Sequence, residues 1–232
     1  MTDSRLKTWG VFCSLTSALC WGTTFIAGRW LLKDGHIDPF SLAAIRFAVG
    51  GALLFLISLC FFRKRLLAVS IGDLATLSGL SLLGVVGMSA FLFAGQARTT
   101  AAVNASLIMA LGPVMIMILG AFVGERITPS IVIGTVVSLF GCAMALRIIR
   151  PSGVVLSSAT FAGDFLVFLS VLCWTFYSVF SRHLVARLGG LTAASWCAVF
   201  GAAGLIILRA LWPGDVAIPP QTAPGQWTVV LY

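Results

Sequence analysis

Residues 39–62 have the sequence PFSLAAIRFAVGGALLFLISLCFF, and this stretch decides the class of the protein. Arg46 is the one charged side chain in it. About 20 apolar residues in a helix are enough to cross a hydrocarbon core of about 30 Å. The stretch therefore predicts a transmembrane helix.

Comparable apolar blocks lie on both sides of it. Together the seven blocks are Thr8–Leu32, Pro39–Phe62, Ile71–Ala94, Ala101–Gly124, Thr128–Ile149, Ala162–Ala186 and Leu191–Trp212. Charged residues make up 9% of the 232 residues and hydrophobic residues 59%, whereas a soluble domain carries roughly 25% charged residues. We expect an all-α, polytopic membrane protein with seven visible spans and the start of an eighth near Trp227, and not a soluble domain.

The first span is expected to remain in the protein. Arg5 and Lys7 precede it, as basic residues precede the apolar core of a signal peptide. The apolar run to Leu32 is longer than a signal-peptide core of about 7–15 residues, and no small-residue cleavage site follows. We therefore interpret it as a transmembrane helix.

Basic residues in the short loops predict the orientation. With a cytoplasmic N-terminus, the inner loops hold eight of them, against six in the outer loops. The inner set is Arg5, Lys7, Arg63, Lys64, Arg65, Arg126, Arg182 and Arg187, and the outer set is Arg29, Lys33, Arg98, Arg147, Arg150 and Arg209. The positive-inside rule favours this orientation. It also explains the net charge of +8 without a nucleic-acid partner.

The sequence contains an internal repeat. Sliding it on itself by 153 residues places Leu19-Cys20-Trp21 on Leu172-Cys173-Trp174 and Arg29 on Arg182. The same offset also places Phe47 on Phe200, Gly51 on Gly204 and Gly72 on Gly225. Leu-rich helices give some spurious similarity, but one ungapped offset serves three helices. A duplication is the interpretation we adopt.

A duplicated unit with an odd number of spans must enter the membrane from opposite sides. We expect an inverted-topology repeat, with a first five-helix unit at residues 8–149 and an incomplete second unit at residues 162–232. The counterparts of roughly residues 80–149 are missing. On this prediction the chain is the larger part of a ten-helix protein of about 300 residues.

Several short motifs resemble one known family. They are Ala97-Arg98-Thr99-Thr100-Ala101-Ala102, Ser106-Leu107-Ile108, Pro113, Gly124-Glu125-Arg126-Ile127-Thr128, Trp21-Gly22-Thr23-Thr24-Phe25, Pro39-Phe40, Ala43-Ala44 and Arg46-Phe47. In these the chain resembles the EamA family of the drug/metabolite transporter superfamily. The Gly-Glu-Arg-Ile-Thr segment after a Pro-containing helix is the most specific of them.

The resemblance implies a fold and a function. Such proteins have ten helices in two inverted halves with both termini in the cytoplasm. They export or exchange small metabolites, amino acids among them, across a plasma or bacterial inner membrane. We expect a small-molecule substrate, a lipid bilayer and no cofactor. We also expect alternating access about a midplane cavity lined by the first, third, fourth and sixth helices. A homodimer is among the assemblies the sequence permits.

Arg46 is the first candidate for the substrate site. It lies about 10 Å along its helix from the outer boundary, at about 1.5 Å per residue. Ionisable residues inside the membrane are functional candidates by default, and Arg46 could bind a substrate carboxylate. The alternative is that Arg46 bonds to helix-end carbonyls or extends to the interface and only shapes the fold, since its repeat counterpart is Val199.

Trp21 and Trp174 are repeat counterparts in mid-helix, away from the interfacial zone where Trp usually lies. Thr24, Tyr177 and Ser178 follow them by three or four residues, hence on the same helix faces. These side chains could line the cavity and present hydroxyls to a polar substrate. Alternatively, the tryptophans pack against neighbouring helices and the hydroxyls bond within or between helices.

The fourth span supplies the remaining candidates. Asn104 and Ser106 belong to the family-like stretch and could face the cavity. Pro113 removes a backbone hydrogen bond and should kink the helix, either as a hinge or as a static bend. Glu125 follows the span and could form an ion pair at a gate or remain a solvated loop charge.

Other classes of protein find less support. The six cysteines have no Cys-x-x-Cys spacing, so we expect buried free thiols and no metal site. No carboxylate lies in mid-membrane, which favours facilitated exchange or a coupling group in the missing helices. No catalytic motif is present, and His36 and His183 fall at opposite faces, so an enzyme is not expected. A truncated, non-transporting membrane fragment or scaffold remains the alternative.

Overall fold

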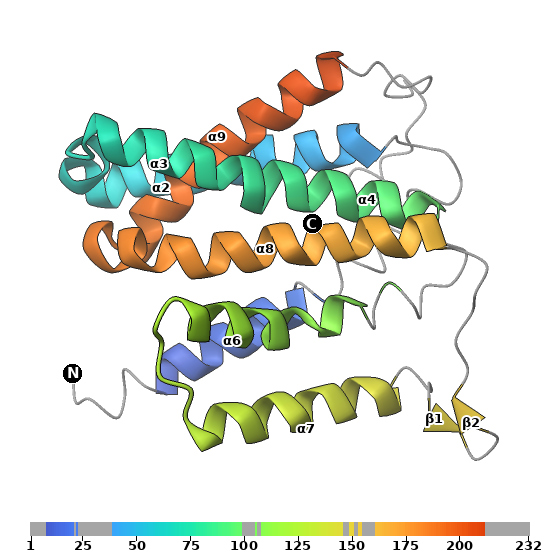
Figure 1. The fold of residues 1–232 in the computed structure, drawn as a ribbon. Coiled ribbons are helices and arrows are strands. Elements are labelled where there is room, and N and C mark those ends of the chain that lie inside the picture. The colour runs from blue at the N-terminus through green and yellow to red at the C-terminus, as the bar shows by residue number, and fades with distance from the viewer. Residues whose placement is uncertain are drawn as a thin grey trace.

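The computed structural model describes residues 8–20, 22, 39–98, 105, 108–145, 149–150, 153–154 and 161–211. Almost all of this part is helical (Figure 1). The helices are Thr8–Cys20, α2 (Pro39–Leu67), α3 (Ile71–Ser81), the π-helix η1 (Leu82–Gly87), α4 (Met88–Arg98), α6 (Gly112–Phe122), α7 (Pro129–Ala145), α8 (Phe161–Leu188) and α9 (Gly190–Leu211). Two short antiparallel strands, β1 (Ile149–Arg150) and β2 (Gly153–Val154), complete it.

The expected spans are found as apolar helices. In the described part, four helices are long and apolar enough to cross a membrane: Phe40–Leu67, Ile71–Gln96, Phe161–Leu188 and Gly190–Leu211. Three shorter apolar helices, Thr8–Cys20, Ile108–Phe122 and Pro129–Gly141, fall within the other three predicted spans. The rest of those spans lies outside the described residues. The prediction of an all-α membrane protein is confirmed.

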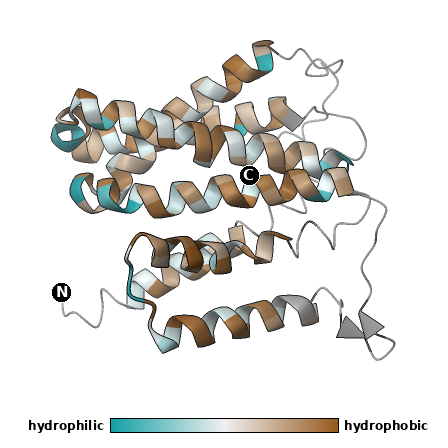
Figure 2. Ribbon diagram, viewed as in Figure 1, coloured by the Kyte–Doolittle hydropathy of each residue, from teal (hydrophilic) through white to brown (hydrophobic). Residues whose placement is uncertain are grey.

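The outer surface of the helices is apolar, while the polar residues gather at the helix ends (Figure 2). Phe61 is 76% exposed, Ile133 63% and Leu53 57%. In water such a surface would be an aggregation liability, whereas in a bilayer it faces lipid. Cys60 lies exposed on this surface and Cys197 is buried, so burial of every thiol was a wrong expectation.

Helices α2 and α9 pack closely and antiparallel. Arg209 Nε, near the end of α9, donates to Ser41 Oγ at the start of α2 over 2.8 Å. At the other end, Trp196 Nε1 donates to the carbonyl of Leu66 over 3.1 Å. That carbonyl belongs to the last turn of α2, where carbonyl groups have no N–H partner within the helix. Next to the Trp196 contact, a buried 2.6 Å hydrogen bond joins the hydroxyls of Ser58 and Ser195.

The third span is one apolar helix with a π-helical turn, η1, at its centre. Its glycines allow α8 to approach closely. A Cβ on Gly84 would overlap the Tyr177 ring, and one on Gly87 would lie 3.1 Å from Cys173 Sγ. On Gly95 it would lie 2.8 Å from Val167. Membrane helices commonly associate through small residues, because burial of apolar surface gives no driving force in lipid.

Three helix–helix turns meet at one end of the bundle. Asp73 in the first turn of α3 pairs with Arg187, and Glu125 after α6 pairs with Arg182. Both arginines lie in the last turns of α8. This arrangement is the one expected of antiparallel neighbours that cross the membrane in alternate directions.

We expect Gly84→Ala to destabilise the protein by about 1–3 kcal/mol, because the added methyl group overpacks the contact with Tyr177. Gly79→Ala is the matched control, since a Cβ there meets nothing within 4 Å and alanine has the higher helix propensity. Thermal unfolding in detergent measures both. Equal melting temperatures for the two variants would contradict the close approach of η1 and α8.

Candidate functional site

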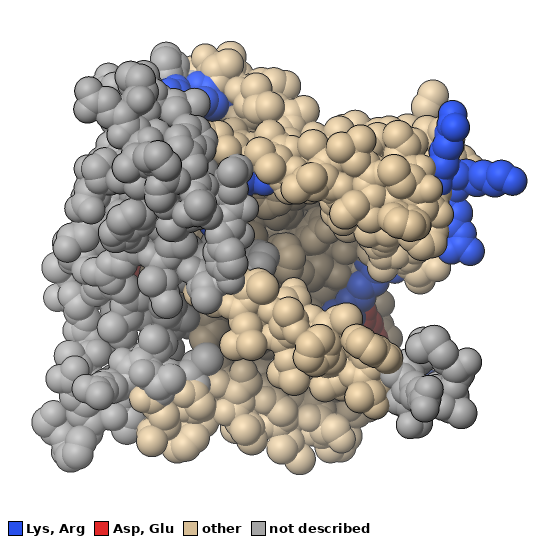
Figure 3. Space-filling view, turned by 180° about the vertical axis from the view of Figure 1, so that it is seen from behind, with Lys and Arg blue, Asp and Glu red and all other residues tan. Residues whose placement is uncertain are grey.

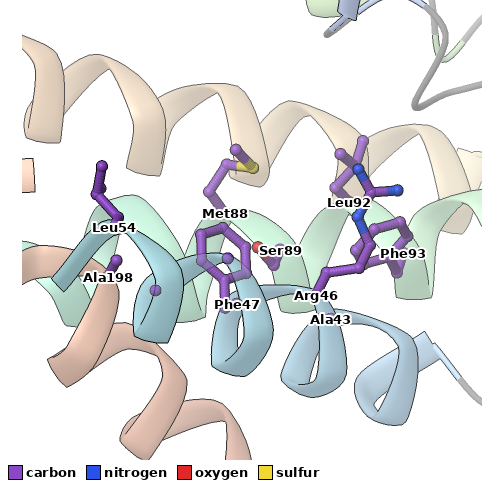
Figure 4. Close-up of a pocket in the computed structure, with 11 residues that line it drawn as sticks. Ala43, Arg46, Phe47, Leu54, Met88, Ser89, Leu92, Phe93 and Ala198 are labelled. Carbon is purple, nitrogen blue, oxygen red and sulfur yellow. The ribbon is translucent and has the colours of Figure 1, made fainter. Parts of the chain in front are cut away.

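A cavity of about 310 Å³ lies between α2, α4 and α9 (Figure 4). Its lining residues are Ala43, Arg46, Phe47, Gly50, Gly51, Leu54, Met88, Ser89, Leu92, Phe93 and Ala198. Small-molecule sites in proteins are typically cavities of about 300–1,000 Å³ with apolar walls and a few placed polar groups. The volume of this cavity is at the lower end of that range and suits a small metabolite.

Helix α2 forms one wall of the cavity with a regular helical stripe. Its lining residues recur at the spacing of one helix face, three or four residues apart. Gly50 and Gly51 lie in the middle of this stripe and have different surroundings. A Cβ on Gly51 would lie 3.2 Å from Ala198, whereas one on Gly50 would meet nothing within 4 Å. Gly51 therefore lets α9 approach, and Gly50 leaves space open.

The cavity contains one cationic side chain. Arg46 extends from α2 toward α4, where its guanidinium group lies at the Leu92 and Phe93 end of the lining (Figure 4). Arg46 is half-buried. The hydroxyl-bearing Ser89 lies in the facing wall and is only 2% exposed.

The rest of the lining is apolar and partly aromatic. Phe47, Met88 and Phe93 provide bulky walls around the same space. Guanidinium donates hydrogen bonds in a planar fork that matches a carboxylate. The arrangement can hold a small molecule with an acidic head and an apolar body.

Trp174 and Tyr177 do not line this cavity. Their rings contact each other on α8, with centroids 5.4 Å apart. Trp174 packs in the cluster of Met88, so it lies behind one cavity wall, while Tyr177 packs in a second cluster with Leu77 and Leu184. Ser178 is half-buried on the same helix. The structure thus places these residues in helix packing around α8.

The hinge and gate candidates are at the ends of α6. The fourth span is interrupted at Leu111, and Pro113 lies in the first turn of α6, where its missing N–H costs little. Gly124, with φ of +88°, ends α6. Glu125 N–H then donates to the Gly120 carbonyl over 2.9 Å, as in a Schellman motif. After this turn, Glu125 forms an ion pair with Arg182.

Four candidates, Trp21, Thr24, Asn104 and Ser106, lie outside the described residues. The cavity also contains residues that sequence reasoning missed. Phe47 and Gly50 could have been found by following the helix face of Arg46. Met88, Ser89 and Phe93 could not, because which face of α4 meets α2 depends on the π-helical turn before it.

Basic side chains are concentrated at the end of the bundle where the ion pairs lie (Figure 3). Arg63, Lys64 and Arg65 are exposed at the end of α2. The two arginines of α8 that pair with Glu125 and Asp73 lie at the same end, and so does Arg126, which directly follows Glu125. Among the described residues, no group of three or more His, Cys, Asp or Glu side chains could bind a metal.

These features define a multi-pass helical membrane protein with a metabolite-sized cavity between its helices. Residues 8–147 match the sequence profile of the EamA-like transporter family. The chain belongs to this family, whose members are transporters. The resemblance found in the short motifs is thereby confirmed.

Similar proteins include an uncharacterized transporter of Archaeoglobus fulgidus, 29% identical over 197 residues, which cover 84% of this chain and 65% of the relative. The uncharacterized transporter YyaM of Bacillus subtilis is 27% identical over 215 residues, 91% of this chain and 68% of YyaM. The aromatic amino acid exporter YddG of Ancylobacter novellus is 27% identical, covering 85% of this chain and 68% of the exporter.

The fold is also found in a solved structure. A protein of known crystal structure superposes with a TM-score of 0.66 at 24% identity, covering 93% of this chain and 72% of the other. This chain spans about two thirds of the length of the curated relatives that it matches.

The open space at Gly50 can be tested by labelling. In a background without the six native cysteines, Gly50→Cys should react with a small water-soluble thiol reagent, because the cavity admits water. A bulky water-soluble reagent should react much more slowly, since the cavity of about 310 Å³ excludes it.

Gly79→Cys is the control, because Gly79 is exposed on the apolar surface of α3 away from the cavity lining. It should be protected from both reagents by lipid. Protection of Gly50→Cys from the small reagent, or equal rates with both reagents, would contradict a narrow aqueous cavity at this position.

Proposed function

We propose that this protein exports small carboxylate metabolites, amino acids or related compounds among them, by alternating access about the cavity between α2, α4 and α9. The observation that carries the proposal is the combination of the Arg46 guanidinium group with a lining that, apart from Ser89, is apolar and aromatic. Membership of a transporter family supports it. So does the 27% identity to a protein named as an aromatic amino acid exporter.

The position of Arg46 supports a role in binding. It lies one to two turns into α2 and in the half of the helix away from the basic cluster. Placing a charge near the bilayer centre costs about 2.5–3.5 kcal/mol on insertion scales. A carboxylate held against the guanidinium neutralises that charge while the substrate is in the low-dielectric cavity. A carboxylate paired with the guanidinium therefore occupies the low-dielectric cavity at a lower cost than either ion alone.

An inverted repeat is the second part of the proposal, with units at residues 8–149 and 162–232. The offset of 153 residues relates α2 to α9. A two-fold axis in the membrane plane requires equivalent helices to run in opposite directions. The antiparallel packing of α2 and α9, from Ser41–Arg209 at one end to Leu66–Trp196 at the other, supports this relation.

The orientation that we propose has the N-terminus and the basic end of the bundle in the cytoplasm of a bacterial or plasma membrane. Arg63, Lys64 and Arg65 at this end favour it by the positive-inside rule. The ion pairs Glu125–Arg182 and Asp73–Arg187 then hold the cytoplasmic ends of the helices together. Partly exposed pairs contribute only about 0.2–1 kcal/mol each, so a conformational cycle can break and re-form them.

We expect Arg46→Gln to reduce uptake of labelled L-phenylalanine into proteoliposomes at least tenfold, since it removes a charge-assisted hydrogen bond to the carboxylate. Arg46→Lys retains the charge without the planar fork and should give an intermediate rate. Arg63→Gln is the control, because Arg63 is exposed and outside the cavity. Counterflow by the full-length protein measures all three.

Two results would contradict this assignment. Equal counterflow by wild type and Arg46→Gln would return Arg46 to a purely structural role. Absence of transport by the folded full-length wild-type protein, across a panel of amino acids and other carboxylates, would favour the alternative of a non-transporting membrane protein.

The gate is tested by exchanging charges. Glu125→Arg places two cations together at the end of α8 and should shift the protein toward the state open to the cytoplasm. Reversing the partner as well, in Glu125→Arg with Arg182→Glu, should restore the wild-type distribution. This distribution is measured by labelling Gly50→Cys with a thiol reagent added from one side of the membrane or from the other. Failure of the double variant to restore the distribution would remove this pair from the gate.

A further inference from the structure

Gln96 has a buried acceptor atom that the protein does not satisfy. Among the residues that the structure describes, its side-chain Oε1 is buried and has no hydrogen-bond partner. A buried acceptor without a partner costs about 1–3 kcal/mol. Gln96 is the last residue of the third span, and a buried atom of this kind needs an explanation.

Gln96 lies outside the cavity lining itself, on the same helix face as the α4 residues that form it. The α4 residues that line the cavity are Ser89, Leu92 and Phe93, which precede Gln96 by seven, four and three residues. Residues at these spacings share one face of a helix. Gln96 therefore lies one turn, about 5.4 Å, beyond Leu92 and Phe93 on the cavity side of α4.

The end of the cavity toward Gln96 is also the end that Arg46 reaches. The Arg46 guanidinium extends to the level of Leu92 and Phe93 (Figure 4). The two side chains have complementary chemistry, since guanidinium only donates hydrogen bonds and the amide oxygen only accepts them. A ligand between them would present a carboxylate to Arg46 and an N–H or O–H donor to Gln96.

We infer that Gln96 Oε1 accepts a hydrogen bond from the donor group of the substrate, most favourably an ammonium group. The inference rests on the proposed function, in which Arg46 binds the carboxylate. It narrows the substrate class from small carboxylates to α-amino acids, in which the ammonium and carboxylate groups share one carbon atom. Sites built to bond a substrate donor discriminate strongly against analogues that lack it.

Three ligands with the same aromatic body separate the two contacts. L-Phenylalanine carries both groups, 3-phenylpropanoate lacks the ammonium group, and 2-phenylethylamine lacks the carboxylate. Binding to the purified full-length protein is measured by calorimetry for wild type, Gln96→Leu, Gln96→Glu and Arg46→Gln. Thermal unfolding of each variant confirms that it is folded.

We expect Gln96→Leu to lower the affinity for L-phenylalanine and for 2-phenylethylamine by about tenfold to a hundredfold. This is the range expected for the loss of a hydrogen bond to a charged group. Its affinity for 3-phenylpropanoate should remain within about twofold of wild type. Gln96→Glu keeps an acceptor oxygen and adds negative charge, so it should bind 2-phenylethylamine more tightly than wild type. Arg46→Gln should show the opposite pattern: it should lower the affinity for the two ligands with a carboxylate, L-phenylalanine and 3-phenylpropanoate, and leave that for 2-phenylethylamine unchanged.

The outcomes distinguish the two assignments. If Gln96→Leu leaves all three affinities unchanged, or lowers them equally, the inference is overturned, and Gln96 Oε1 is instead satisfied by a water molecule or serves only the packing. If wild type binds neither carboxylate, the assignment of Arg46 fails. Loss of 2-phenylethylamine binding in Gln96→Leu would then still support the acceptor role of Gln96.

Discussion

The bilayer removes water as a hydrogen-bond partner, and the arrangement of this protein follows from that constraint. Polar groups within the spans must find partners inside the protein. Ser58 and Ser195 bond to each other between α2 and α9. The Trp196 indole satisfies a carbonyl at the end of α2. Against these paired groups, the oxygen of Gln96 is buried and unsatisfied among the described residues, and we infer that its partner comes from outside the chain.

Glycine has two opposite uses in this bundle. Gly84, Gly87 and Gly95 allow α8 to approach the third span, where a methyl group would collide with it or press against it. Lipid gives no hydrophobic force between helices, so this close packing provides the attraction. Gly50 does the reverse, because it leaves a gap on the helix face of Arg46. Glycine thus allows close helix packing next to the cavity and leaves empty space within the cavity.

Hydropathy predicted the spans well, because a helix in lipid needs a long apolar run whatever its neighbours are. It also identified Arg46, since one charge in such a run is conspicuous. The rest depends on tertiary contacts. The π-helical turn of η1 rotates the following residues relative to a regular helix, so the cavity-facing side of α4 could not be derived from spacing. Tyr177 has the position expected of a lining residue, yet the missing side chain of Gly84 leaves room that its ring occupies.

The ion pairs at the basic end are the contacts that the proposed transport cycle would break. Helix α8 contacts α3, η1, α4, α6 and α9, and its last turns carry both paired arginines. The side chains of Arg182 and Glu125 are 47% and 41% exposed, so solvent screens their attraction and limits its strength. The apolar and glycine contacts within the membrane are numerous and are retained if helices move as rigid groups. In the transport cycle that we propose, the contacts that must break are therefore weak ones at the surface. A carboxylate bound at Arg46 would then need to supply only a small free energy to change their balance.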